Sequence, residues 1–323
     1  MRVLIAGGTG FIGRKLAHAL ASRGDAVVVL SRGRGDVASH GLPASAQLVT
    51  WNAAEGEAVD SLGLRRSSSL EAEVGKADAV VNLSGAGVAD ERWTKERVAL
   101  IRSSRVDTTT SLARALARAP RPTERVLVNG SAVGIYGMRK DAEIVDEKSA
   151  HGRDVLAEIV EAWEASTQAA RDVGVRVAIA RIGLVLGADG GFLQKMLTPF
   201  KWFVGGPVGS GAQYLSWVHW RDTVSALLFA IDRKDFDGPF NLSAPNPVTM
   251  NEFARALGEA LGRPSRFRVP AFAMKLAMGE GLSEIVLTGQ RAMPRKLQDA
   301  GFAFELPDLG AALRDVVAAR GAR

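Results

Sequence analysis

The chain has 323 residues, of which 47% are hydrophobic and 24% charged, with a formal net charge of +6 and no cysteine. This composition is typical of a globular protein with ample core, as one large domain or two smaller ones. The absence of cysteine excludes disulfides, thiolate nucleophiles and Cys-ligated metals. The four histidines are scattered without metal-ligand spacing, so we expect no metal site.

The positive charge is dispersed along the chain rather than gathered in blocks, and aromatic residues do not alternate with basic ones. This pattern argues against nucleic-acid binding as the main role. No apolar run is long enough to span a bilayer, and glycine interrupts the first apolar run too early for a signal sequence. We therefore expect a cytoplasmic monomer or homodimer that acts on a small molecule and has no membrane partner.

The first thirteen residues carry the clearest motif. The apolar run 2–6 predicts a buried parallel strand, and 14–23 reads as a helix. Between them, Gly7, Gly10 and Gly13 permit a tight turn, leave room for a pyrophosphate and let the helix pack close to the strand. The unpaired N–H groups at the start of such a helix form an anion site. The motif predicts dinucleotide binding; the alternative is a plain strand-to-helix turn.

The second strand is predicted at 26–30, and the residues at its end select the cofactor. An acidic residue at this place would bind the ribose 2′-hydroxyl of NAD, whereas this chain has Ser31 and Arg32, with Arg34 close by. A guanidinium favours a 2′-phosphate, so we expect NADP, with NAD as the second choice. The alternative is that Arg32 only faces solvent.

Further strands are predicted at 47–51, 79–83, 125–128 and 175–182, and helices at 70–74, 91–117 and 154–173. The alternation predicts an α/β Rossmann fold, a doubly wound parallel sheet. Glycine and proline become frequent after Gly187, which predicts a smaller substrate lobe. We expect a dinucleotide-binding domain at 1–187 and this lobe at 188–323, with a strand and helix around 216–240 returning to the first domain.

The motifs together resemble the extended short-chain dehydrogenases/reductases, and more narrowly the atypical, SulA-like NAD-dependent epimerase/dehydratase family. The resemblance extends over nearly the whole chain. It is carried by the glycine turn, Asn82-Leu-Ser-Gly-Ala-Gly87, Arg92-Trp-Thr, Ser131-Ala-Val-Gly-Ile-Tyr-Gly137, Trp163-Glu164, Gly205-Gly-Pro-Val-Gly-Ser-Gly211, Gln213, Ser216-Trp-Val-His219, Asp222, Pro245-Asn-Pro247, Gly279-Glu280, Pro294, Lys296 and Gly301-Phe302.

The resemblance implies a nucleoside-diphosphate-sugar epimerase or an oxidoreductase, with the cofactor along the carboxyl ends of the strands. The residues expected to bind this cofactor are Gly7, Thr9, Gly10, Phe11, Ile12, Arg32, Asn52, Leu83, Ser84, Gly85, Ala86, Arg105 and Arg181. Side chains that could contact an anionic or planar substrate are Arg181, Lys195, Gln213 and Trp217. For each of these four, a structural or rim position is the favoured alternative.

The wider superfamily uses a tyrosine with a lysine four residues later, in which the lysine lowers the pKa of the tyrosine. The helix at 154–173 contains neither residue type. Tyr136 and Lys140 have the spacing, but they lie in the loop after the fifth strand, so we interpret Lys140 as a coincidence. The expected chemistry therefore lacks the usual pair, and a cofactor-dependent sensor or partner-binding protein without catalysis is the alternative.

Ser131 and Tyr136 are the candidate catalytic residues. Ser131 could donate to a substrate carbonyl, or its hydroxyl could satisfy its own turn. Tyr136 could be a displaced acid, although a packed ring with an anchored hydroxyl is favoured. The other polar or aromatic residues expected near the nicotinamide are Glu147, Glu158 and Trp163. A Ser–His–Asp hydrolase using His219 and Asp222 is disfavoured, because Ser131 lacks a nucleophile elbow. We expect Asp222 to cap a helix and His219 to line the cleft.

Overall fold

A central sheet of eight strands organises the molecule, in a computed structural model that describes residues 1–32, 35–51, 58–60 and 70–321. The strand order is β12-β8-β6-β5-β1-β2-β3-β4, and every neighbouring pair is parallel except β3 with β4. The strands are β1 Arg2–Ala6, β2 Ala26–Ser31, β3 Gln47–Trp51, β4 Ala58–Asp60, β5 Ala79–Asn82, β6 Val126–Ala132, β8 Arg176–Ile182 and β12 Gly238–Leu242. The predicted doubly wound parallel sheet is confirmed.

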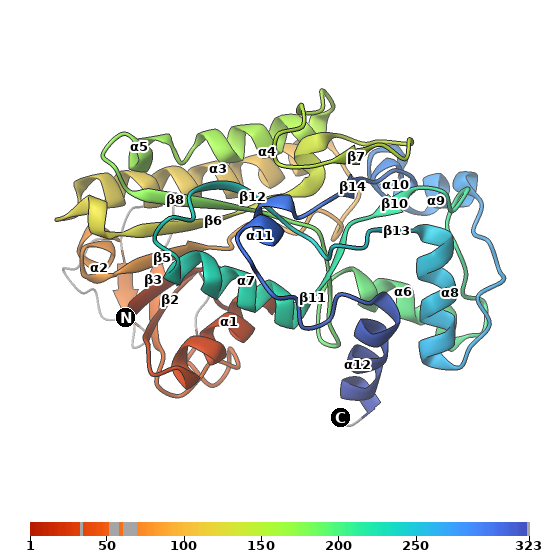
Figure 1. Cartoon of the computed structure of the whole chain (residues 1–323), viewed down its shortest axis with the longest axis horizontal. Helices are drawn as coiled ribbons and strands as arrows, with labels where there is room; N and C mark the ends of the chain where they lie inside the picture. The colour runs from red at the N-terminus through yellow and green to blue at the C-terminus, as the bar shows by residue number, and fades with distance from the viewer. Residues whose placement is uncertain (33–34, 52–57, 61–69, 322–323) are drawn as a thin grey trace.

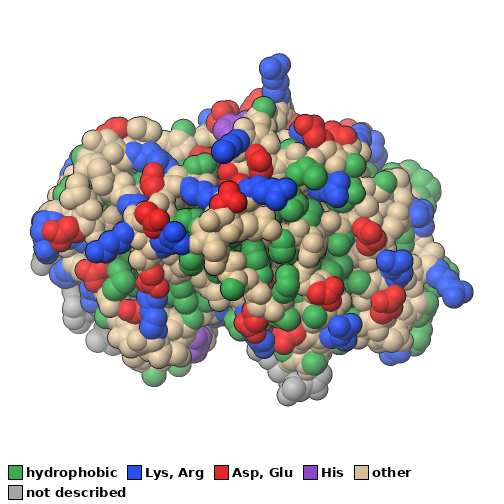
Figure 2. All heavy atoms as spheres, in the orientation of Figure 1, with side chains coloured by type: hydrophobic (Ala, Val, Ile, Leu, Met, Phe, Trp, Pro, Cys, Tyr) green, Lys and Arg blue, Asp and Glu red, His purple; other side chains and the backbone are tan. Residues whose placement is uncertain are grey.

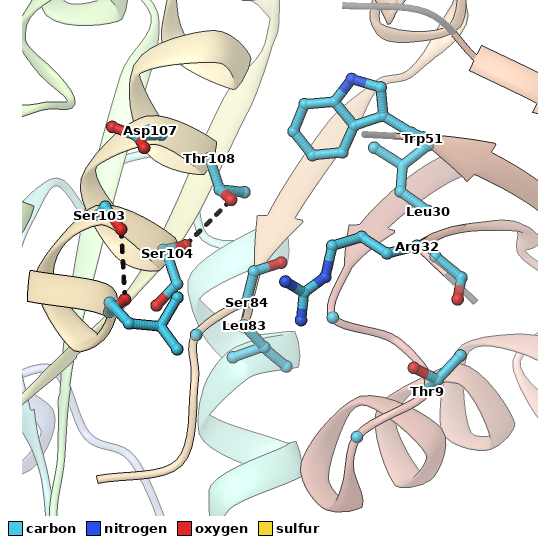
Figure 3. A pocket seen from close by; sticks show the side chains of 15 residues that line it. Thr9, Leu30, Arg32, Trp51, Leu83, Ser84, Ser103, Ser104, Asp107 and Thr108 are labelled. Atoms are coloured by element: carbon cyan, nitrogen blue, oxygen red, sulfur yellow. Dashed lines mark hydrogen bonds between the residues drawn. The ribbon is translucent and has the colours of Figure 1, made fainter. Parts of the chain in front are cut away.

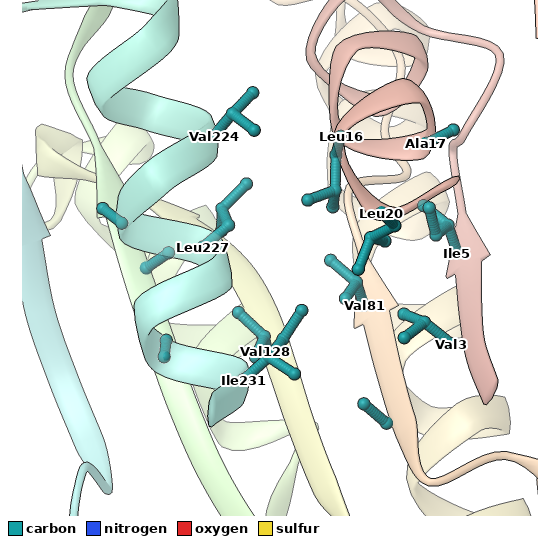
Figure 4. Packing of buried hydrophobic residues seen from close by; sticks show 14 of the residues in the cluster. Val3, Ile5, Leu16, Ala17, Leu20, Val81, Val128, Val224, Leu227 and Ile231 are labelled. Carbon is teal, nitrogen blue, oxygen red and sulfur yellow. The ribbon is translucent and has the colours of Figure 1, made fainter. Parts of the chain in front are cut away.

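Helices cover both faces of this sheet (Figure 1). On one face lie α1 (Phe11–Ser22) and α7 (Trp220–Asp232). Figure 4 shows Leu16 and Leu227 of these helices pointing into the same core, above Val81 of β5. The other face carries α2 (Leu70–Lys76), α3 (Lys95–Arg118), α4 (Val155–Ala165) and α5 (Gln168–Arg171). The chain winds outward from β1 in both directions, which leaves a crevice at the carboxyl ends of β1 and β5.

Several element bounds differ from those predicted. The helix expected from residue 91 begins at Lys95, because the Thr94 side chain caps it by accepting a hydrogen bond from the Arg97 N–H. The helix expected at 154–173 is broken into α4 and α5. The short strand β4 lies in a stretch expected to be loop and helix, and it extends the edge of the sheet beside β3.

The C-terminal lobe forms the other end of the molecule (Figure 1). Its core packs α8 against α12 and includes Phe200, Trp217 and Phe253. Its elements are β9 Leu184–Leu186, α6 Phe192–Lys201, β10 Tyr214–Leu215, β11 Trp217–His219, β13 Val248–Thr249, α8 Met250–Leu261, α9 Ala271–Met278, α10 Glu280–Leu287, β14 Arg291–Ala292, α11 Arg295–Asp299 and α12 Leu309–Gly321, and β14 pairs with β7 (Ile144–Val145). The short 3-10 segments are Pro122–Glu124 and Val133–Tyr136.

The chain passes from this lobe back to the central sheet. After β11, α7 packs on α1, and β12 becomes the edge strand beside β8. The boundary at residue 187 stays a prediction. No helix in the described part of the chain is both long enough and apolar enough to cross a membrane.

Candidate functional site

The glycine turn between β1 and α1 has the geometry of an anion site. Gly7 has φ +79°, and a Cβ there would lie 2.7 Å from the Leu83 backbone. A Cβ on Gly13 would lie 2.3 Å from the Gly7 carbonyl oxygen, so both positions require glycine. Gly10 is the N-cap of α1, and no side chain caps the helix. The first N–H groups of α1 and the positive end of its dipole are therefore available to a bound anion.

A cavity of about 350 Å³ opens at this turn; we call it the first cavity (Figure 3). It is lined by Gly7, Thr9, Gly10, Leu30, Ser31, Arg32, Trp51, Leu83, Ser84, Gly85, Leu100, Ser103, Ser104, Asp107 and Thr108. Figure 3 shows the Arg32 side chain extending from the end of β2 toward Ser84, and the Trp51 indole beside Leu30. Among the described residues, no carboxylate pairs with the Arg32 guanidinium.

One wall of the first cavity was not foreseen from the sequence. It is formed by α3, through side chains spaced three to four residues apart: Leu100, Ser103, Ser104, Asp107 and Thr108. This spacing places them on one helical face, which is the signal that could have identified them. Trp51 was also missed, although it directly precedes the predicted Asn52, which lies outside the described residues.

Arg105 supports the loop that closes the first cavity. Its guanidinium donates hydrogen bonds to the carbonyl oxygens of Ala86 (3.0 Å) and Ile101 (2.9 Å). It packs so closely on Gly85 that a Cβ there would lie 2.9 Å from Arg105 Cζ. Burial, with a smaller contribution from the charge of Arg97, lowers the pKa of Arg105 to about 10. Arg105 thus fixes the position of the loop from behind.

A second cavity, of about 530 Å³, lies at the carboxyl ends of β6 and β8 and reaches into the C-terminal lobe. Its lining is largely aliphatic: Val88, Ala89, Ala132, Val133, Gly134, Met138, Leu156, Ile182, Gly183, Leu184, Gly191, Leu215, Met250, Leu282, Ile285, Val286 and Gly289. The polar members of the lining are Asp90, Gln194, Tyr214, Ser216, Thr288 and Gln290. Among the described side chains that line it, Asp90 is the single charged group.

Known proteins are similar to this chain in both sequence and fold. The model of the NAD dependent epimerase/dehydratase family matches residues 3–243, and that of a domain of unknown function, DUF1731, matches 269–316. The chain belongs to the NAD dependent epimerase/dehydratase family. This family membership confirms the resemblance seen in the sequence.

Individual members of this family are similar to this chain over most of their length. An epimerase family protein of Mycobacterium leprae is 39% identical over 311 residues, which cover 96% of this chain and 94% of that protein. The crystal structure of human epimerase family protein SDR39U1 with NADPH is 32% identical, with a TM-score of 0.83, and the match covers 98% and 99% of the two chains. That complex agrees with the expectation of NADP as cofactor.

A second solved structure is similar over part of its length. The nucleoside-diphosphate sugar epimerase of Corynebacterium glutamicum is 29% identical with a TM-score of 0.75, and the match covers 98% of this chain and 58% of that one.

The predicted cofactor residues divide into two groups in this epimerase-family chain. The first cavity brings together Gly7, Thr9, Gly10, Arg32, Leu83, Ser84 and Gly85. Phe11 and Ile12 are the first two residues of α1: their side chains pack against the core, and their backbone N–H groups are among those available to an anion. The Ala86 carbonyl oxygen accepts a hydrogen bond from the Arg105 guanidinium, and neither residue lines the first cavity.

Arg181 is the clearest departure from the prediction, because it lies in a buried network rather than in the first cavity. Its guanidinium is paired with the Glu164 carboxylate at 2.9 Å and donates to the Tyr136 hydroxyl at 3.0 Å. Burial acts to lower the pKa of Arg181, but the contact with Glu164 raises it. Ser131 donates to the same carboxylate at 2.6 Å.

Tyr136 is placed as a packed ring with an anchored hydroxyl. The ring is 1% exposed, and its hydroxyl donates to Asn241 Oδ1 at 2.7 Å. Burial raises the pKa of Tyr136 to about 12, although the charge of Arg181 acts in the opposite direction. Lys140 is exposed, and no described contact joins it to Tyr136. Neither Ser131 nor Tyr136 lines either cavity, which is the physical argument against a direct catalytic role.

His219 and Asp222 do not have the roles expected of them, and neither lines the two cavities. His219, not Asp222, is the N-cap of α7, and its Nδ1 accepts from the Arg221 N–H. Asp222 is buried, and its carboxylate accepts hydrogen bonds from the N–H groups of Glu305 and Leu306. These bonds hold the segment before α12 in place. His219 Nε2 lies 3.2 Å from the Asp315 carboxylate. Ser131 is bonded elsewhere, so no Ser–His–Asp triad is assembled.

The remaining candidates have structural positions. Glu158 is exposed, Glu147 accepts from the Asn241 and Lys296 N–H groups, and the Trp163 indole donates to Thr109. The amide of Gln213 donates to the Val208 and Val286 carbonyls, and the Trp217 indole donates to the Asn246 carbonyl. The Lys195 side chain lies outside the described part of the structure.

Proposed function

We propose that this protein binds NADPH in the first cavity and reduces a neutral, largely apolar carbonyl compound in the second. The observation that carries the proposal is that the uncapped start of α1 and the guanidinium of Arg32 open into the same cavity. The start of α1 provides N–H donors for a pyrophosphate, and the Arg32 guanidinium can donate paired hydrogen bonds to a 2′-phosphate. The complex of human SDR39U1 with NADPH supports this choice of cofactor.

The residues of the first cavity fit the parts of NADPH. The largely buried Trp51 indole lines the place for an adenine ring, and Ser84 with Gly85 leaves room for a ribose against the backbone. Gly10 is open on the side of the cavity, because the single contact of an added Cβ would be the Gly7 carbonyl oxygen at 3.2 Å. When bound, NADPH supplies a hydride.

The lining of the second cavity favours a neutral substrate. Burying a charge without a partner is unfavourable, the described side chains that line this cavity include no lysine or arginine for an anion, and the carboxylate of Asp90 already faces Arg97 at 4.0 Å. The Ser216 hydroxyl is already used, because it donates to the Gln290 carbonyl and accepts from the Ala292 N–H. The aliphatic walls leave few polar groups to orient a substrate, which suits a compound with a single carbonyl.

Tyr214 is the proton donor in this proposal. Of the two tyrosines in the chain, Tyr214 lines the second cavity, whereas Tyr136 is buried with its hydroxyl bonded. The Tyr214 hydroxyl would hold the carbonyl oxygen and give it a proton as the carbonyl carbon gains the hydride, so that the products are an alcohol and NADP⁺. Helix α4 contains neither tyrosine nor lysine, so no lysine on it can activate a tyrosine for the reverse reaction.

A second candidate is epimerisation of a nucleoside-diphosphate sugar, the activity named for the C. glutamicum relative. The two candidates differ in the charge of the substrate and in the fate of the cofactor. Epimerisation leaves no net change in the cofactor, whereas reduction consumes NADPH. A third candidate is the sensor, which would bind NADPH without turnover.

The experiment is a screen that follows NADPH absorbance, together with product analysis. The panel contains aliphatic and aromatic ketones and aldehydes, and nucleoside-diphosphate sugars. We expect NADPH to be consumed with an apolar carbonyl, and Tyr214→Phe to lower this rate at least about 100-fold, the lower range for a general acid. Tyr136→Phe is the matched control and should retain the rate.

Three outcomes would contradict the proposal. Isomerisation of a nucleoside-diphosphate sugar without loss of NADPH would establish the epimerase candidate. Tight NADPH binding with no turnover of any compound would support the sensor. Loss of rate in Tyr136→Phe but not in Tyr214→Phe would return the proton donor to Tyr136.

A further inference from the structure

Helix α9 is apolar at every position except Lys275 and yet lies at the surface. Its sequence is Ala-Phe-Ala-Met-Lys-Leu-Ala-Met, and none of its residues is buried. Phe272 and Leu276 are 73% and 79% exposed. They are four residues apart and therefore lie on one face of the helix. An apolar helix face of this kind is normally buried against another surface, and Phe272 and Leu276 have no such cover here.

A second exposed apolar segment lies close to the start of this helix. It follows α6 and consists of Trp202, Phe203 and Val204, which are 76%, 52% and 51% exposed. Phe267, which is 56% exposed, donates its N–H to the Gly205 carbonyl and so joins this segment to the irregular stretch that leads into α9. We call the six exposed side chains the apolar patch: Trp202, Phe203, Val204, Phe267, Phe272 and Leu276.

Basic side chains gather on the two segments that carry the apolar patch, whereas the exposed carboxylates of Glu280 and Glu284 lie on helix α10, which packs against α9. No Asp or Glu occurs in the sequence from residue 190 to 221 or from 260 to 279. The exposed cations within these ranges are Lys201, Arg263, Arg266, Arg268 and Lys275. The Arg263 guanidinium lies 4.3 Å from the centre of the Phe203 ring. Figure 2 shows hydrophobic side chains beside basic ones, with some acidic side chains among them, over the end of the molecule formed by α8 and α9.

We propose that the apolar patch docks this protein on the surface of an anionic lipid bilayer. Aromatic and aliphatic side chains enter the boundary between headgroups and acyl chains, and neighbouring lysines and arginines attract anionic headgroups. This combination favours a membrane over an acidic protein, because the exposed side chains are large and apolar and the cations lie on the same two segments. The protein binds from one side, without a spanning helix, which revises the expectation of no membrane partner.

The position of the patch connects it with the second cavity. Helices α9 and α10 pack together, and α10 contributes Leu282, Ile285 and Val286 to the cavity lining. The face of α9 that carries Phe272 and Leu276 is exposed. Docking would therefore place a helix pair that borders the apolar cavity against the lipid, where apolar carbonyl compounds are concentrated. Docking does not depend on the proposed reduction.

The test is sedimentation of the full chain with vesicles of phosphatidylcholine alone or with 40% phosphatidylglycerol. We expect binding to the anionic vesicles, weakened by salt, and at least tenfold weaker binding to the neutral ones. Phe272→Ser with Leu276→Ser should weaken binding at least tenfold, and so should Arg266→Gln with Lys275→Gln. The matched controls are Ile144→Ser for the apolar pair and Lys148→Gln with Lys234→Gln for the cations, all exposed and outside the patch.

The melting temperature and NADPH affinity of each variant verify its folding, and light scattering reports its oligomeric state. Absence of vesicle binding by the unmodified chain would overturn the proposal. Binding that survives both patch variants would also overturn it. A dimer that dissociates in Phe272→Ser with Leu276→Ser, without vesicle binding, would show that a second copy of the chain covers the patch.

Discussion

Single glycines decide whether the first cavity can accept a cofactor. Gly7 and Gly13 lie so close to neighbouring backbone that a side chain at either position would disturb the fold. Gly10 differs, because an added Cβ would have one close neighbour, at 3.2 Å, and would otherwise point into the cavity. Gly10 is therefore the position at which binding can be separated from folding.

Gly10→Val should abolish NADPH binding, because the added methyl groups occupy the place of the pyrophosphate. The melting temperature should change little. Calorimetric titration and a thermal melt on the same sample check both statements. Retained affinity in a folded variant would show that no phosphate lies at this turn. Ser22→Val, at an exposed position of the same helix, is the matched control.

Glu164 is a second residue with a defined role, because it alone among the described carboxylates balances the charge of Arg181. Arg181 is 2% exposed, so Glu164→Gln leaves a buried guanidinium without its counterion. We expect a loss of about 3 kcal/mol in the free energy of unfolding, the lower range for breaking a buried pair. Urea denaturation measures it. Glu158→Gln on the same helix should stay within about 0.5 kcal/mol, and equal effects would contradict the account.

At the scale of elements, His219 joins the start of α7 to α12. Burial lowers the pKa of His219 to about 4, although the charge of Asp315 acts to raise it. The pKa of the unfolded chain is higher, at about 6.5. The unfolded state therefore takes up a proton first as pH falls, and the stability that neutral His219 provides is present above about pH 6.5 and lost as pH falls toward 4.

The expected loss from His219 over this range is on the order of 3 kcal/mol. Denaturant unfolding between pH 7.5 and 4 measures it. His219→Gln should flatten this part of the profile, because the amide does not titrate. A profile with the same slope in the variant would assign the acid sensitivity to other groups. Burial raises the pKa of Asp222, which opposes the effect and remains in both proteins.

Elements with strong local signals could be predicted, and side-chain partners could not. The apolar runs that became β1, β2 and β5 lie within about one residue of their expected ends, because each ends at a change in polarity. The role of Arg181 could not be read from its place at the end of β8. Glu164, its partner, comes from α4, and such a contact depends on how the helix packs on the sheet. Tyr214 was overlooked for the same reason, since β10 meets the cavity only after the lobe has folded.

At the scale of the whole molecule, both cavities lie at the carboxyl ends of the strands of the central sheet. The first lies at the ends of β1, β2, β3 and β5, and the second at the ends of β6 and β8, beneath the C-terminal lobe. The sheet could be predicted from the sequence because each strand is a local pattern. The second cavity could not, because its lining comes from segments between residues 88 and 290.

Arg32 is the residue through which we propose that the first cavity selects NADPH. Isothermal calorimetry of the unmodified chain and of Arg32→Ala, each titrated with NADPH and with NADH, tests this proposal most directly. We predict that NADPH binds more tightly than NADH, and that the substitution weakens NADPH by about 1.5–3 kcal/mol, the value for a hydrogen bond to a charged group, while NADH changes little. Equal affinities of the unmodified protein for the two cofactors, or equal losses for both in Arg32→Ala, would contradict the claim.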